Sequence, residues 1–414
     1  MDKCKLVDDG NLSFAKHIVA LMPEQFHTKD IIPHCIPKPP CYRDNDKPCG
    51  RMLSGWRDEL NIEKLPGNNP KGALWREKSG RVIHKPTLES STSAAISGRD
   101  KECITCTENK CKNDSAFKKT ARIHQLKYRQ QVLNASCGET CSDLSLEAAQ
   151  KGMNLYSDYN VFGKAKAKHS DTSAQIYSDM LRSQHIPLNI FIPLFYEEML
   201  LKAVIKELLG IDVESITRKI IEYAPKKKDF VHQPLVNAVE FGVGNRNDFL
   251  NDNTAFDAYI ELGQKASKKT ILCIEMKYTE QPKTEDYIGN NNADYRTVAE
   301  QSNLFVNPKD IKIYESRGFG QMVRNILLAE SMMQNQITGI NEYRSIILYP
   351  KGNSSYVSAI PKFTEFLKDE NSGRFGGLTY EDLFSAIRKL APSYQSQSRI
   401  CKWVDYLESR YIVK

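Results

Sequence analysis

The segment Asn251-Asp-Asn-Thr-Ala-Phe-Asp-Ala-Tyr-Ile-Glu-Leu262 is followed, one short turn later, by Thr270-Ile-Leu-Cys-Ile-Glu-Met-Lys277. Both stretches are typical of β-strands, and the charged turn between them favours an antiparallel hairpin. Side chains two residues apart on a strand point to the same face, so Glu275 and Lys277 project together. Asp257 lies on the preceding strand and can reach the same place.

Two carboxylates and one ammonium group at one place suit the hydrolysis of a phosphodiester. Carboxylate oxygens hold a hard cation such as Mg²⁺, which stabilises charge on the phosphoryl oxygens and activates a water molecule. A lysine adds a cationic donor beside the scissile phosphate. All eight histidines lie at or before His232, so a histidine general base is disfavoured in the half of the chain that carries this pattern.

The surrounding sequence predicts an α/β fold with a mixed central sheet flanked by helices. Residues 196–210 form a helical pattern that ends at a glycine, as many helices do. Further patterns indicate strands over 235–243 and 343–350 and a helix over 320–333. The predicted order is a helix, two or three strands, a helix and a strand. This order is typical of a small α/β core in which helices flank a sheet.

Glu197 lies near the start of the first of these helices, on the same face as the apolar Leu201 and Val204, whereas Glu198 lies to its side. A carboxylate on a buried face needs a partner. A metal site at this end of the helix would supply one, and so would a structural salt bridge. The sequence leaves both interpretations open.

Taken together, residues 180–360 resemble the PD-(D/E)xK, or restriction-endonuclease-like, phosphodiesterase superfamily, and more narrowly a bacterial restriction-endonuclease-like subgroup. The likeness rests on four motifs: Ser183-Gln184, Thr254-Ala-Phe-Asp257, Ile274-Glu-Met-Lys-Tyr278 and Gln321-Met-Val-Arg-Asn325. Each motif alone is weak, but four in order at plausible spacing are much stronger. Phe256 stands where the literal motif has proline, a common departure in the superfamily.

The resemblance implies a restriction-endonuclease-like core in which Asp257 and Glu275 ligate Mg²⁺ and Lys277 positions the nucleophile. It also implies that Glu197, or alternatively Glu198, completes the catalytic site from the first helix and that Gln321 approaches from the later one. For Gln321, the alternative is a solvent-facing position on an ordinary amphipathic helix.

Residues 1–180 differ in composition from the rest, which predicts a boundary between a Cys-rich, irregular N-terminal region and a nuclease domain over 181–414. Eight of the eleven cysteines fall between Cys35 and Cys141. Cys103 and Cys106 form a C-x2-C pair with Cys111 close by, a spacing that suits structural Zn²⁺. An iron–sulfur cluster and free thiols are the alternatives. A zinc-stabilised region of this kind could serve as a DNA-recognition module.

The net charge of +7 is modest, but the basic residues cluster. Such clusters suit contacts with a phosphate backbone, and the alternative for each is solvated surface. The clusters are Lys118, Lys119, Arg122, Lys127 and Arg129; Lys164, Lys166 and Lys168; and Lys226, Lys227 and Lys228.

These observations predict a Mg²⁺-dependent DNA endonuclease, specifically a bacterial restriction or defence enzyme. A homodimer is expected, because cutting both strands generally needs two sites. A structure-specific repair or mobile-element nuclease is one alternative, and a non-catalytic, zinc-stabilised DNA-binding protein is another. The sequence shows no signal peptide and no apolar run long enough to span a bilayer, which predicts a cytoplasmic protein with reduced cysteines and no disulfide framework.

Overall fold

The computed structural model describes residues 111–171, 175–231, 239–283 and 292–413, together with three short strands nearer the N-terminus. These are β1 (Gln25–His27), β2 (Ile62–Lys64) and β3 (Leu74–Glu77), and both β1 and β2 pair antiparallel with β3. The chain forms two compact units, Met1–Ala95 and Ile96–Lys414. The boundary at 180/181 expected from composition therefore falls inside the second unit.

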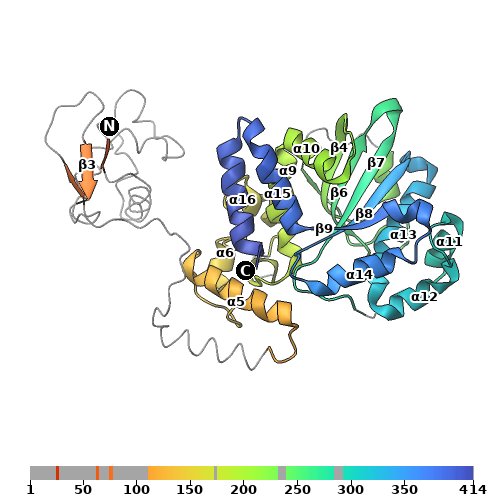
Figure 1. The fold of residues 1–414 in the computed structure, drawn as a ribbon, viewed down its shortest axis with the longest axis horizontal. Coiled ribbons are helices and arrows are strands. Elements are labelled where there is room, and N and C mark those ends of the chain that lie inside the picture. Colours follow the sequence, from red (N-terminus) through yellow and green to blue (C-terminus); the bar gives the residue numbers. More distant parts are fainter. Residues whose placement is uncertain are drawn as a thin grey trace. The chain divides into compact units, whose positions relative to one another are not determined.

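The second unit is built on a six-stranded mixed sheet in the order β5-β4-β6-β7-β8-β9 (Figure 1). Its strands are β4 (Ser215–Tyr223), β5 (Glu240–Phe241), β6 (Phe256–Gly263), β7 (Lys269–Met276), β8 (Glu342–Tyr349) and β9 (Phe375–Thr379). Strand β6 pairs antiparallel with both β4 and β7, whereas the other three pairs are parallel. The predicted mixed sheet and the β6–β7 hairpin are confirmed.

One face of the sheet is covered by α9 (Ile186–Tyr196), α10 (Glu198–Leu209), α15 (Tyr380–Leu390) and α16 (Gln397–Tyr411), seen together in Figure 1. Helix α9 is buried almost from end to end because its sequence is apolar on every side. Helix α10 presents only one apolar stripe and ends at Gly210, whose φ of 67° is a conformation that glycine adopts without strain.

The opposite face is covered by α11 (Asn292–Ser302), α12 (Ile311–Tyr314), α13 (Gly320–Gln334) and α14 (Ser354–Thr364) (Figure 1). The side chains of each central strand alternate between the two apolar cores. In β7, Cys273 packs with the helices of this second face, whereas Ile274 packs with those of the first. Both cores are therefore filled from the same strands.

The chain between residues 111 and 180 belongs to this same body. It contains α5 (Ala116–Gln131), α6 (Leu146–Gln150), α7 (Val161–Lys168) and α8 (Gln175–Ser178). Arg410 of α16 is buried and donates hydrogen bonds to Gln125 of α5 and to Asn154. Because these contacts join the two ends of the unit, the change in composition near residue 180 does not mark a structural division.

Among the helices that the structure describes, none is long and apolar enough to cross a lipid bilayer.

Candidate active site

Asp257, Glu275 and Lys277 meet at one end of the sheet. Asp257 is the second residue of β6, Glu275 is the last but one of β7, and Lys277 directly follows β7. The antiparallel register pairs Ala258 with Ile274, so Asp257 lies opposite Glu275. The alternation along β7 puts Glu275 and Lys277 on the face that α13 covers.

Lys277 is buried, and its ammonium group has two partners. Nζ lies 2.5 Å from Glu275 Oε1 and donates a 2.9 Å hydrogen bond to Gln321 Oε1 of α13. Burial lowers the pKa of Lys277, but the neighbouring carboxylates, first of all Glu275, raise it by more. The pKa ends above its ordinary value, so Lys277 remains a cation.

Glu275 is held at both oxygens. Its second oxygen, Oε2, accepts a 3.0 Å hydrogen bond from Asn325 Nδ2. Asn325 is only 1% exposed and lies one helical turn after Gln321, so the two amides reach the site from the same face of α13. The sequence pattern alone gives Asn325 no role of its own. The available signals are its place at the end of the Gln321–Asn325 motif and its position as a polar residue on the buried face of a helix.

Asp257 is the most perturbed carboxyl group of the site. Its Oδ2 accepts a 2.6 Å hydrogen bond from the backbone N–H of Met276. Burial raises the pKa of Asp257 well above its ordinary value, and the negative charge of Glu275 raises it further; Lys277 and the Met276 amide oppose this only in part. A proton or a cation at Asp257 would therefore be favourable.

This donor set fits a magnesium ion. No group of three or more His, Cys, Asp and Glu side chains is arranged as metal ligands within the described part of the chain. Asp257 and Glu275 supply two carboxylates, and Mg²⁺ is commonly held by one or two carboxylates while water and phosphate oxygens complete its shell. The two residues would hold the ion from adjacent strands.

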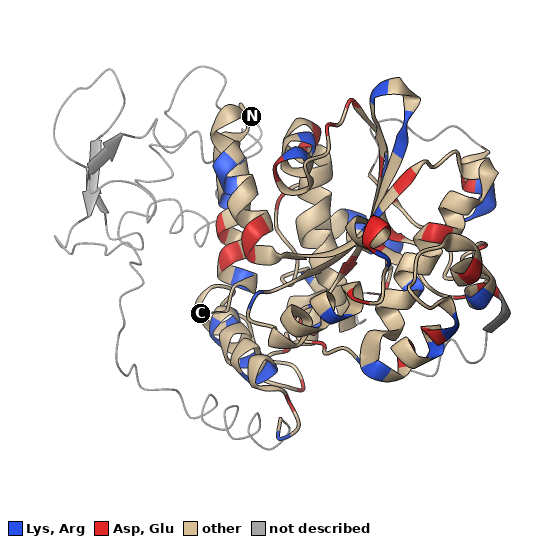
Figure 2. Cartoon of the chain, turned by 45° about the vertical axis from the view of Figure 1, so that its right-hand side comes forward, with Lys and Arg blue, Asp and Glu red and all other residues tan. Residues whose placement is uncertain are grey.

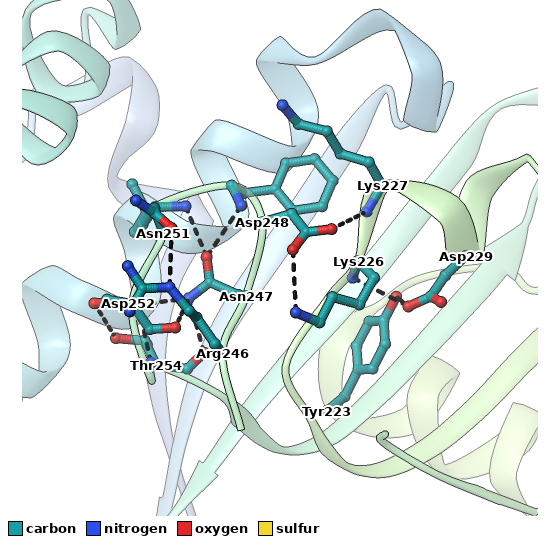
Figure 3. Close-up of polar contacts among 12 residues, drawn as sticks. Tyr223, Lys226, Lys227, Asp229, Arg246, Asn247, Asp248, Asn251, Asp252 and Thr254 are labelled. Atoms are coloured by element: carbon teal, nitrogen blue, oxygen red, sulfur yellow. Dashed lines mark hydrogen bonds and ion pairs between the residues drawn. The ribbon is translucent and has the colours of Figure 1, made fainter. Parts of the chain in front are cut away.

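The approach to β6 is built around the buried carboxylate of Asp252 (Figure 3). Its oxygens accept hydrogen bonds from the Thr254 backbone N–H at 2.9 Å and the Thr254 hydroxyl at 2.8 Å, and also from Asn247 and Tyr295. This network fixes the turn that leads into Asp257. In the same view, Lys226 pairs with Asp248 on the surface of the loop.

The backbone after Lys277 is clamped by side chains from distant parts of the chain. The Tyr380 hydroxyl donates a 2.8 Å hydrogen bond to the Lys277 carbonyl. The Tyr278 carbonyl accepts from Asn353 at 3.0 Å, and the Tyr278 hydroxyl accepts from Gln125 at 2.8 Å. No local pattern in the sequence pointed to these residues, because each acts on a partner more than 70 positions away.

Glu197 lies elsewhere. Its carboxylate accepts hydrogen bonds from the Tyr159 hydroxyl and from the Ser396 hydroxyl, each at 2.8 Å. These partners belong to the layer of α9, α10 and α16, on the face of the sheet opposite α13. Glu198 pairs with Lys219 at 2.8 Å. The structure thus joins four of the five predicted catalytic residues and leaves Glu197 apart.

The predicted zinc ligands fall mostly outside the described residues, including Cys103 and Cys106. Within the described part, Cys111 is buried, and burial raises the pKa of its thiol. Cys137 is exposed, whereas Cys141 is disulfide-bonded, contrary to the expectation that the cysteines are reduced. A sulfur in a disulfide is not a zinc ligand, so the structure removes Cys141 from the candidate donors.

Comparison with known proteins agrees with this geometry. A family model described as the PD-(D/E)XK nuclease superfamily matches residues 112–234 and 236–413. The match starts at the beginning of the α5 region, not near residue 180, and includes all the residues of the site. Searches of curated proteins and of solved structures found no match.

Proposed function

This chain belongs to the PD-(D/E)XK nuclease superfamily, and on that basis we propose that it is a Mg²⁺-dependent DNA endonuclease. The observation that carries the proposal is the convergence of Asp257, Glu275 and Lys277 at one end of the β6–β7 hairpin, with Lys277 Nζ 2.5 Å from Glu275 Oε1. Two carboxylates beside a buried cation are what phosphodiester hydrolysis with a metal ion needs.

In this proposal, Asp257 and Glu275 hold the Mg²⁺ ion. Bound there, the ion would stabilise charge on the phosphoryl oxygens and activate a water molecule. Lys277 stays protonated, and its ammonium group donates a hydrogen bond to the phosphate oxygen or to the attacking water. Gln321 accepts from Lys277 Nζ at 2.9 Å and so orients the ammonium group.

We propose DNA as the substrate because the sequence shows no aromatic-rich signature of RNA recognition. A bacterial restriction or defence role follows from the resemblance of the four motifs to the restriction-endonuclease-like subgroup. A homodimer would place two sites on the two strands of a duplex. Light scattering of the purified protein, alone and with duplex DNA, tests the dimer.

The test is cleavage of plasmid, phage and methylated genomic DNA by the purified full chain, with Mg²⁺ or with EDTA. Asp257→Ala is compared with Asp212→Ala, which removes a carboxylate from an exposed surface ion pair with Lys206. We expect Mg²⁺-dependent cleavage by the wild type and by Asp212→Ala, and none by Asp257→Ala. Discrete fragments would add sequence specificity.

Two other results would change the assignment. Equal DNA binding by the wild type and Asp257→Ala, with no cleavage of any substrate, would support a non-catalytic DNA-binding protein. Cleavage confined to branched or single-stranded DNA would support a structure-specific repair or mobile-element nuclease.

We also propose that cysteines between Cys35 and Cys137, without the disulfide-bonded Cys141, bind a structural zinc ion, with Cys103, Cys106 and Cys111 as the core of the donor set. Elemental analysis of the protein purified without added metal tests this. We expect zinc in the wild type and its loss in Cys103→Ser. The control variant Cys273→Ser, which changes a buried core cysteine, should retain the zinc. Zinc-free wild-type protein would contradict the proposal.

A further inference from the structure

Two neighbouring cavities lie at the candidate active site, and Lys277 lines the first of them. The first has a volume of about 120 Å³ and is lined by Lys277, Gln321 and the segment 280–283. The second is larger, about 480 Å³, and lies between the start of α5 and the same segment. Glu280, Gln281 and Lys283 line both, so the two cavities are neighbours that share one wall.

We call the larger cavity the α5 groove. Its lining includes hydroxyl and basic side chains: Ser115, Lys118, Arg122, Arg182, Thr279 and Lys283. Its volume lies within the range of about 300–1,000 Å³ that is typical of ligand sites. Basic residues recur along α5 (Figure 2). Lys118 and Arg122 of this helix line the groove.

Some charges of the groove are already neutralised within the protein. Asp114 accepts from both Lys118 and Arg122, at 3.1 and 2.9 Å. Glu280 accepts from the backbone N–H groups of Tyr278 and Ser183, at 2.7 and 3.2 Å. These contacts hold the walls of the groove in place. Asp114 is neutralised by its two cations, whereas Glu280 keeps its negative charge, because backbone N–H groups are neutral.

Two of the cations that line the groove have no carboxylate partner among the residues that the structure describes. Arg182 donates only to the side-chain oxygens of Gln184 and Gln175, and Lys283 is exposed with no ion pair. Both stand at the junction of the cavities: Lys283 lines each of them, and Arg182 directly precedes Ser183, which binds Glu280.

Glu280 and two further carboxylates of the groove limit which part of it can take an anion. Asp143 and Asp179 belong to a short antiparallel bridge, and the pKa of Asp143 is raised by burial and then by Asp179. A phosphate would be repelled there. It would be attracted to Arg182 and Lys283, which flank the way to Lys277.

We infer that the α5 groove binds the nucleic-acid strand on one side of the scissile phosphate, with Arg182 and Lys283 contacting its backbone. The inference rests on the proposed nuclease function and specifies where the substrate lies. A strand that runs from Lys277 into the α5 groove passes Lys283, because Lys283 lines both cavities. Cations of this kind bind phosphates regardless of base sequence. The hydroxyls of Ser115 and Thr279 add neutral donors to the same walls.

The test is binding of a short fluorescein-labelled duplex DNA, and of one of its strands alone, followed by anisotropy in EDTA at several salt concentrations. The variant Arg182→Ala/Lys283→Ala is compared with Lys265→Ala/Lys268→Ala. The control removes two exposed cations at the opposite end of the β6–β7 hairpin, far from Asp257. The conservative variant Arg182→Lys/Lys283→Arg keeps both charges.

We expect the groove variant to bind the duplex about tenfold more weakly and its salt slope to fall in magnitude by about 1.8, or 0.9 for each lost phosphate contact. The control and the conservative variant should bind like the wild type. The groove variant should show the same thermal unfolding as the wild type, because neither Arg182 nor Lys283 pairs with a carboxylate. The control loses the surface ion pair of Lys268 with Glu342, which contributes little to stability.

The proposal is overturned if the groove variant binds both DNAs with the affinity and salt slope of the wild type. If the wild type still cleaves DNA with Mg²⁺, that result removes the groove alone and leaves the nuclease assignment intact. If the wild type neither binds nor cleaves DNA, the proposed function fails together with the groove.

Discussion

Asn325 of α13 donates a 3.0 Å hydrogen bond to Glu275 Oε2, while Lys277 occupies the other oxygen of the same carboxylate. Glu275 therefore has one defined orientation before any ligand is present. Residues whose rotamers are locked in this way lose little entropy when they bind a metal ion. Helix α13 thus fixes the site, through Asn325 and also through Gln321.

Replacing Asn325 by leucine should destabilise the protein and slow cleavage. The substitution leaves Glu275 Oε2 buried without its donor, which costs about 1–3 kcal/mol. The free energy of unfolding in urea and the cleavage rate measure the two effects. Ser331→Ala, on the same helix, is the control because the buried Ser331 hydroxyl bonds only a carbonyl of its own helix. Equal cleavage by both variants would show that orienting Glu275 is unimportant.

Lys277→Met should reduce cleavage by about 10³-fold, the upper range for the loss of one charge-stabilising donor. It should also destabilise the protein, because Glu275 is left buried without its cation. Adding Glu275→Gln to Lys277→Met should recover part of that stability and none of the activity. Thermal unfolding and single-turnover cleavage of the single and double variants separate these effects. Recovered cleavage in the double variant would refute the catalytic role of Lys277.

Asp257→Asn should change how stability depends on pH when no metal is present. The pKa of Asp257 is raised in the folded protein. The protonated Asp257 carboxyl group therefore contributes fully to the stability of the folded wild type below the unfolded pKa of about 3.9. This contribution is lost as pH rises through the folded pKa. The asparagine variant lacks this loss. In EDTA, its melting temperature should exceed that of the wild type at neutral pH, and the difference should shrink in acid.

The same linkage applies to the metal ion. Mg²⁺ competes with the proton on Asp257, so the stabilisation of the wild type by Mg²⁺ should grow as pH rises. Mg²⁺ should stabilise Asp257→Asn only slightly. Melting temperatures with Mg²⁺ and with EDTA across this pH range test both statements. A difference between the proteins that does not vary with pH would contradict the raised pKa.

Tyr380→Phe should lower the cleavage rate several-fold by releasing the Lys277 carbonyl, and should cost about 1 kcal/mol of stability. Tyr343→Phe is a matched control, because Tyr343 lies near the start of β8 and its buried hydroxyl donates a 2.8 Å hydrogen bond to Glu330 of α13. The control should lose stability without a specific loss of cleavage. If the rate constant for cleavage falls equally in both, Tyr380 has no special role in positioning Lys277.

Glu197→Gln should retain cleavage with Mg²⁺. The structure ties Glu197 to Tyr159 and Ser396 on the face opposite α13, so the variant loses charge-assisted hydrogen bonds and not a metal ligand. We expect a loss of stability of about 1–2 kcal/mol, measured by urea unfolding. Loss of cleavage comparable to that of Asp257→Asn, with the fold intact, would restore the catalytic role that the sequence suggested.

Several features could be predicted because they depend on short stretches of chain. The period of two along β6 and β7 and the turn between them determine the hairpin, and the hairpin determines that Asp257, Glu275 and Lys277 lie together. The order of helices and strands likewise determined the mixed sheet, which the structure confirms.

Other features depend on which surfaces pack together, and the sequence alone did not determine them. A carboxylate on an apolar helix face, such as Glu197, can meet either a metal ion or a hydroxyl, and only the packing of α9, α10 and α16 decides this. The contacts of Asn325 and Tyr380 with the site join segments 50 and 103 residues apart. Composition also separated residues 111–180 from the catalytic body. In the structure, the buried Arg410 joins the two through hydrogen bonds to Gln125 and Asn154. Such partners meet because they are close in space, and they leave no periodic pattern in the sequence.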